Sequence, residues 1–151
     1  EMITASGVSI DVVMGAFLPL LRIADLAVTA SGTATLQLAM AGVPFITVYR
    51  VSPITYFIAR RFAYVKHFTM ANILAGHEVV PELIQEKLTA RNVRDHLLAL
   101  AQDEPRRRRM RDDLLRVTAS LGAPGAYERA AAAIAARLSS LGARTAAGAG
   151  S

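Results

Sequence analysis

The sequence predicts an α/β fold: a parallel sheet flanked by helices, with further helices toward the C-terminus. Short runs rich in β-branched residues alternate with helical stretches over the first half of the chain. This alternation is typical of parallel strands joined by right-handed crossovers. The second half carries apolar residues at helical spacing, and 53% of the 151 residues are hydrophobic, which is enough for one ordinary core.

Three segments of the first half are predicted strands. Residues 8–13 (VSIDVV), 25–29 (DLAVT) and 44–49 (PFITVY) are short, apolar and β-branched. Helices are predicted over residues 16–22 and 34–41, with Gly42 at the C-cap of the second. Ser52 and Pro53 then have the residue types of an N-cap and a first helical position.

Beyond His67 the pattern becomes mainly helical. Residues 72–76 (NILAG) resemble a strand end or loop, and residues 80–87 are predicted to form a short helix that begins near Pro81. Thr89 and Asp103 are predicted to cap two longer helices. Their apolar faces would carry Val93, Leu97 and Leu100 in the first helix, and Met110, Leu114, Val117 and Leu121 in the second.

The chain is therefore divided into three parts: a domain over residues 1–121, a C-terminal helix within 122–141 and a small-residue tail, expected to be disordered, over 142–151. The terminal helix, over residues 126–139, presents a narrow stripe of Tyr127, Ala131, Ile134 and Leu138. Such a stripe needs a surface to cover, either another half of the protein or a partner subunit, so a homodimer is one expectation.

Composition narrows the function classes. There is no cysteine, and the three histidines lack metal-ligand spacing, so neither a disulfide framework nor a zinc-type metal site is predicted. No cofactor is predicted either. The stretch 8–30 contains three charged residues and is not expected to cross a bilayer, and the start lacks the features of a signal peptide. The net charge of +5 favours anionic partners. Nucleic acid is not predicted, because the arginine run 106–109 has no aromatic neighbours and is typical of a solvated helix face.

One turn suggests a ligand. Ser31, Gly32 and Thr33 stand between a predicted strand and a predicted helix, where unpaired backbone N–H groups can hold a phosphate. Serine and threonine at this position are more often simple helix caps.

Three ordered motifs point further. They are residues 24–36 (ADLAVTASGTATL), then 42–44 with 49–55 (GVP and YRVSPIT), and then 72–76 with 80–85 (NILAG and VPELIQ). Together they resemble the lipid-A-disaccharide synthase family, and the resemblance covers about residues 8–138. It implies a Rossmann-like C-terminal half of a GT-B glycosyltransferase, the half that binds the nucleotide.

The resemblance also implies a reaction. UDP-2,3-diacylglucosamine would transfer its sugar to 2,3-diacylglucosamine 1-phosphate, giving a β-1,6 disaccharide with inversion and without a metal. The expected place is the cytoplasm, peripherally on the inner face of the bacterial inner membrane. Residues 54–66, which mix aromatic and basic side chains, offer an interfacial contact, although core packing competes for their aromatics.

The resemblance also implies a nucleotide-binding site made of neutral and charged residues. They are Ser31, Gly32, Thr33, Gln37, Arg50, Asn72, Glu82 and Gln85. Arg50 would stabilise the diphosphate leaving group, with a structural ion pair as the alternative. Asn72 would contact the ligand or instead hold a loop backbone, and Glu82 would orient its neighbours or a sugar hydroxyl.

Two departures from the family pattern stand out: Gln37 replaces a glutamate expected to bind the ribose, and Ala71 replaces a proline. The general base is expected in an N-terminal half that has no counterpart in this sequence, so no catalytic residue is assigned. The chain alone is expected to bind without turnover. A non-catalytic module that binds a UDP-sugar or anionic lipid is the alternative.

Overall fold

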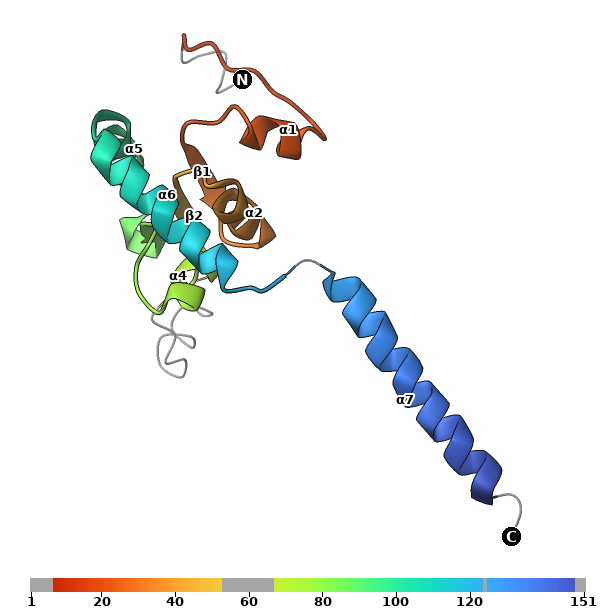
Figure 1. The fold of residues 1–151 in the computed structure, drawn as a ribbon. Coiled ribbons are helices and arrows are strands. Elements are labelled where there is room, and N and C mark those ends of the chain that lie inside the picture. Colours follow the sequence, from red (N-terminus) through yellow and green to blue (C-terminus); the bar gives the residue numbers. More distant parts are fainter. Residues whose placement is uncertain (1–6, 53–66, 124, 149–151) are drawn as a thin grey trace. The chain divides into compact units, whose positions relative to one another are not determined.

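The computed structural model describes residues 7–52, 67–123 and 125–148 (Figure 1). The chain divides into two compact units, Glu1–Ser120 and Leu121–Ser151. The predicted helix that begins at Pro53, and the aromatic and basic stretch of residues 54–66, lie outside the described residues.

The first unit is built on a parallel sheet in the order β1-β2-β3, so the predicted α/β class is confirmed. β1 spans Ala27–Ala30, β2 spans Phe45–Tyr49 and β3 spans Glu82–Ile84. Val28 is in register with Ile46, and Val48 with Leu83. Because the strands are parallel, their carboxyl ends lie at the same edge of the sheet.

Helices pack around this sheet. They are α1 (Phe17–Leu21), α2 (Thr33–Ala41), α4 (Met70–Ala75), the 3-10 turn η2 (Gln85–Lys87), α5 (Ala90–Gln102) and α6 (Glu104–Ala119). α2, α4 and α6 contact one another, and α5 contacts α6 and β2. The core between them includes the fully or almost fully buried side chains of Leu38, Phe45, Ile46, Leu83, Leu100 and Leu114.

The predicted helix ends are largely confirmed. Gly42 ends α2 in the left-handed region, with φ of +66°. Thr89 Oγ1 accepts from Asn92 N at 3.1 Å, and Asp103 Oδ1 accepts from Arg106 N at 2.9 Å, so both predicted caps form. On α6, Met110, Leu114 and Val117 are buried, whereas Leu121 lies beyond the helix end and is exposed.

Two arginines of α6 donate hydrogen bonds to the ends of other helices. Arg107 Nη1 donates to the carbonyls of Leu100, at 2.8 Å, and of Ala101, both in the last turn of α5. Arg111 Nε donates to the Gly42 carbonyl at the end of α2, at 3.0 Å. The last carbonyls of a helix lack intrahelical donors, so these guanidinium groups complete the two helix ends.

Three predicted elements differ in the structure. Residues 8–13 form no strand: Val8, Val12 and Val13 are at least half exposed, and β1 is an edge strand of the described sheet. A β-branched run becomes a strand only where a neighbouring edge pairs with it. Residues 72–76 belong to helix α4, which Gly76 ends at φ +73°. Residues 80–87 contain β3 and then η2 in place of a helix.

The second unit contains α7, which spans Ala126–Gly148 and so continues beyond the helix end predicted at residue 139. Alanine is frequent along it, and alanine has the highest helix propensity, which explains the added length. Tyr127, Ile134 and Leu138 are all more than half exposed. The partner predicted for this stripe stays a prediction.

Candidate functional site

The sheet topology brings several predicted site residues to one edge. Ser31, Arg50 and Gln85 directly follow β1, β2 and β3, at the carboxyl ends of the three parallel strands. Ligands of open α/β sheets bind at this edge.

The Ser31-Gly32-Thr33 turn begins α2. Gly32 is the N-cap residue with φ +156° and ψ −162°, a combination that essentially only glycine adopts. A Cβ placed there would meet nothing within 4 Å, so the backbone angle and not space requires glycine. No side chain caps the helix. Thr35 N donates to the Gly32 carbonyl at 3.1 Å, and the N–H groups before it, at the very start of an α-helix, have no partner within the helix. The turn therefore presents the geometry of an anion site.

Ser31 is tied to the loop before α4. Its Oγ donates to the Phe68 carbonyl at 3.0 Å. Thr35 Oγ1 holds the turn from the other side, donating to the Gly32 carbonyl at 2.6 Å. The hydroxyl of Ser31 is therefore occupied within the protein, whereas Thr33 is exposed.

Asn72 is fully buried and holds the backbone of Val79 and Val80. Its Oδ1 accepts from Val79 N at 2.8 Å and Val80 N at 2.9 Å. Its Nδ2 donates to the Val80 carbonyl at 2.8 Å and to Glu82 Oε1 at 2.9 Å. The structure thus favours the reading in which Asn72 holds a loop backbone, because its side chain offers nothing to a ligand.

The carboxylate of Glu82 completes the same network. Its Oε1 accepts from Phe68 N at 3.0 Å and from Thr69 N at 2.7 Å, in addition to Asn72. Ser31, Asn72 and Glu82 are therefore linked through the Phe68-Thr69 loop. This network fixes the approach of that loop to the glycine turn.

Gln85 and Arg50 form a second cluster. Gln85 Oε1 accepts from Val51 N at 3.1 Å, and Gln85 Nε2 donates to Val51 O at 2.9 Å. Gln85 also has φ +52°, and no other non-glycine residue of the described chain has a positive φ. Arg50 Nη2 donates to Leu88 O at 3.4 Å, a long contact. In the part of the chain that the structure describes, Arg50 makes no ion pair, and it is exposed.

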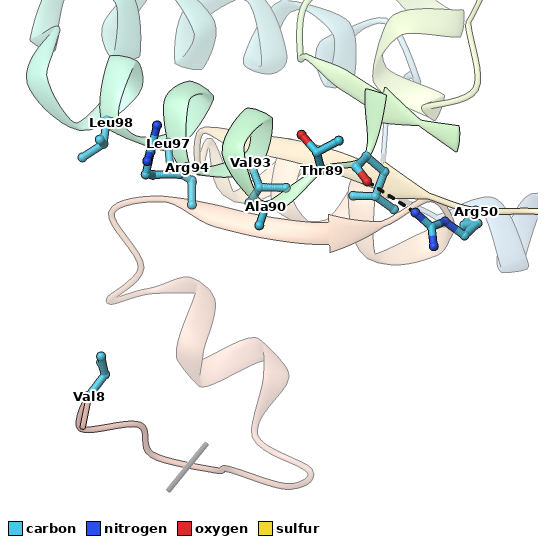
Figure 2. A pocket seen from close by; sticks show the side chains of 9 residues that line it. Val8, Arg50, Thr89, Ala90, Val93, Arg94, Leu97 and Leu98 are labelled. Carbon is cyan, nitrogen blue, oxygen red and sulfur yellow. Dashed lines mark hydrogen bonds between the residues drawn. The ribbon is translucent and has the colours of Figure 1, made fainter. Parts of the chain in front are cut away.

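An open groove of about 1230 Å³ begins at Arg50 (Figure 2). One wall is the apolar side of α5, with Ala90, Val93, Leu97 and Leu98 in a row. Figure 2 shows Arg50 near one end of this row and Val8 across the opening. The groove thus places the guanidinium of Arg50 beside a largely apolar wall, on which Arg94 also lies, paired with Asp95.

Gln37 lies elsewhere. It is exposed on α2 and lines a separate pocket with Leu18, Leu21 and Arg22. The structure therefore joins Ser31, Asn72 and Glu82 in one network and Arg50 with Gln85 in another, and it leaves Gln37 apart from both.

Sequence reasoning missed the backbone partners of the site. Val51, Phe68 and Leu88 take part through main-chain groups, which every residue type carries. No side-chain pattern could have indicated them. Among the described residues no cluster of three metal-ligating side chains occurs, and no helix is long and apolar enough to span a membrane.

A parallel sheet with a glycine turn and an arginine at its carboxyl edge defines a Rossmann-like α/β domain, of the type that forms one half of a GT-B glycosyltransferase. The model of the lipid-A-disaccharide synthetase family matches residues 5–136, and the chain belongs to this family. The resemblance predicted from the three motifs is confirmed.

Similar proteins agree with this membership. The lipid-A-disaccharide synthase of Geobacter metallireducens is 37% identical over 129 residues, which cover 85% of this chain and 34% of that protein. The lipid-A-disaccharide synthase of Acidobacterium capsulatum is 47% identical over 98 residues, covering 65% of this chain and 24% of that protein. The chain spans about a third or less of the length of these curated relatives.

Proposed function

We propose that this chain supplies the nucleotide-binding part of a lipid-A-disaccharide synthase, a glycosyltransferase of lipid A biosynthesis. The donor is UDP-2,3-diacylglucosamine and the acceptor 2,3-diacylglucosamine 1-phosphate, joined by a β-1,6 bond. Family membership and the names of the relatives support the reaction class. The proposed location is the cytoplasmic face of the inner membrane, because both substrates carry acyl chains.

The observation that carries the proposal is the pairing of an uncapped helix start with a cation on one sheet edge. The start of α2 offers backbone N–H groups, and Arg50 offers an exposed guanidinium after the neighbouring strand, with a long 3.4 Å contact to the Leu88 carbonyl. A diphosphate gains negative charge as its bond to the sugar breaks, so donors fixed at this edge stabilise the leaving group.

The geometry separates the roles of the predicted site residues. Gly32, Thr33 and Arg50 are the proposed direct contacts. No side chain caps the turn that contains Gly32, and the side chains of Thr33 and Arg50 are exposed. Ser31, Asn72, Glu82 and Gln85 shape the loops around them, since their polar groups are engaged within the protein. Gln37 contributes only if the ligand extends along α2.

The proposed role stops at binding. An inverting transfer needs a base to deprotonate the acceptor hydroxyl. Of the three histidines, His77 Nδ1 contacts the Ala75 carbonyl at 3.0 Å, and none forms an ion pair with a carboxylate among the described residues. We propose that the base comes from another part of the synthase.

Titration calorimetry with UDP tests the site. Arg50→Ala should weaken binding by about tenfold or more, since hydrogen bonds to charged groups contribute about 1.5–3 kcal/mol. Arg109→Ala, which removes the same charge from an exposed position on α6, is the matched control and should leave the affinity unchanged. Absence of heat from the unaltered chain, or equal losses in both variants, would overturn the proposal.

A further inference from the structure

We propose that Gln85 is a positioning residue that holds Arg50 in place for an incoming diphosphate. The inference rests on the proposed function and adds a specific role to a residue that makes no direct ligand contact in it. It is drawn from the backbone contacts of Gln85 and from its unusual conformation.

The side chain of Gln85 grips the backbone directly after Arg50. Its amide both accepts from the Val51 N–H, at 3.1 Å, and donates to the Val51 carbonyl, at 2.9 Å. The two bonds use both ends of the amide and both polar groups of one peptide residue. Such a two-point contact fixes the orientation of the chain as well as its position, much as neighbouring strands fix each other.

The backbone of Gln85 is in a region that disfavours side chains. Its φ of +52° follows β3 directly and begins η2. Left-handed backbone at a residue with a long side chain persists only where the surroundings impose it, and such sites concentrate near functional groups. Here the left-handed turn and the Val51 contact belong to the same residue.

The same short turn reaches the guanidinium of Arg50. Leu88 follows η2, and its carbonyl accepts from Arg50 Nη2 at 3.4 Å. Residues 85–88 therefore hold Arg50 at two places, by its following residue and by its side-chain end. Because the 3.4 Å contact is long, the guanidinium can transfer to a stronger acceptor without losing a strong bond.

This arrangement lowers the ordering cost of binding. An arginine side chain has many rotamers, and fixing it in one of them when it binds a ligand costs conformational entropy. If Gln85 already restricts Arg50 to few rotamers, this entropy cost is smaller. The affinity for the ligand then depends on Gln85, although Gln85 makes no ligand contact.

Two variants separate the amide contact from the backbone conformation. Gln85→Gly accepts φ +52° freely but has no side chain, and Gln85→Asn tolerates the left-handed region but is one methylene too short to reach Val51. Each should weaken UDP binding by about three- to tenfold in calorimetry. In the double variant with Arg50→Ala, the loss should stay within about twofold of that caused by Arg50→Ala alone.

A second readout needs no ligand. The order parameter of the Arg50 Nε–H group, measured by NMR relaxation, should fall in both Gln85 variants. Arg94 lines the same groove and pairs with Asp95, so its Nε–H group is an internal control that should not change. An unchanged Arg50 order parameter, or additive losses in the double variant, would overturn the positioning role. If UDP fails to bind the unaltered chain while Arg50 still loosens, the proposed function fails and the positioning role stands.

Discussion

At the scale of single residues, Asn72 shows how a polar side chain can be essential without meeting a ligand. Its amide makes four hydrogen bonds, and its side chain is fully buried. An asparagine amide has two donor hydrogens and two acceptor lone pairs, so its capacity is filled inside the protein. We therefore expect replacement of Asn72 to lower the stability of the fold, and to affect ligand binding only through that loss.

Replacing Asn72 by alanine should lower the free energy of unfolding by about 3 kcal/mol or more, because buried backbone groups of Val79 and Val80 and the partly buried carboxylate of Glu82 lose their partner. Urea unfolding monitored by circular dichroism measures the change. Asn92→Ala is the control: its side chain makes one bond, to the Lys87 carbonyl, and its loss should cost about 1 kcal/mol. Equal losses in the two variants would contradict the assigned role.

Glu104 gives a prediction about pH. Hydrogen bonds from Arg108 and then Arg107 lower the pKa of its carboxyl below the usual value. A lowered folded-state pKa means that its contribution to stability is complete above the unfolded pKa of about 4.3, and is lost as the pH falls through the lower value. NMR titration should show this pKa rising in Arg108→Ala and staying constant in Arg109→Ala.

The sequence could predict the position of the site better than its contacts. The turn 31–33 was found because a small polar turn between a strand and a helix has a known physical use. Asn72, Glu82 and Gln85 are predicted as site residues from the motifs, but the contacts that they make depend on the backbone of Val51, Phe68 and Val79. Such partners are decided by folding in three dimensions and leave no mark on residue type.

At the scale of elements, α6 connects the layers of the first unit. It contacts α2, α4 and α5, and its side chains Met110, Leu114 and Val117 are buried in the shared core. The apolar stripe that predicted this helix therefore also predicted its buried face.

Leu114→Ala should lower the free energy of unfolding by about 2–5 kcal/mol, because a fully buried leucine leaves both lost contacts and a cavity. Leu115→Ala on the same helix is the matched control. Leu115 is 44% exposed, so its replacement should cost less than about 1 kcal/mol. Chemical denaturation of the two variants compares them directly, and similar losses would mean that α6 buries a different face.

The predicted elements failed where they were short or lacked a neighbour. β3 has three residues, too few to reveal an alternating pattern, and Pro81 before it resembles the first residue of a helix. α4 has only six residues, and Gly76 after it was interpreted as part of a loop, although glycine is equally common at the end of a helix. The longer helices α5 and α6 were predicted because the capping residue and the apolar stripe of each indicate the same helix.

At the scale of the whole molecule, the buried core belongs to the first unit. Its large hydrophobic members lie between Leu21 and Val117, and the described side chains of α7 are exposed. Folding of the first unit should therefore depend little on the second.

A chain shortened to end at Ser120 should keep its unfolding midpoint within about 3 °C of the full chain, since a change of 1 kcal/mol moves the Tm of a domain of this size by about 4 °C. Thermal unfolding followed by circular dichroism checks this, with the loss of α7 visible in the total helical signal. A drop of about 8 °C or more would show that the second unit contributes to the stability of the first.

Arg107 and Arg111 donate hydrogen bonds to the ends of α5 and α2, and this affects how a polyanion would bind to this protein. Counterion release scales with the number of phosphates that a protein neutralises, so log K falls with log salt in proportion to that number. A polyelectrolyte lying along α6 would have to compete with the protein's own carbonyls for two of its guanidinium groups. Its salt slope should therefore be shallower than a count of arginines in the sequence implies.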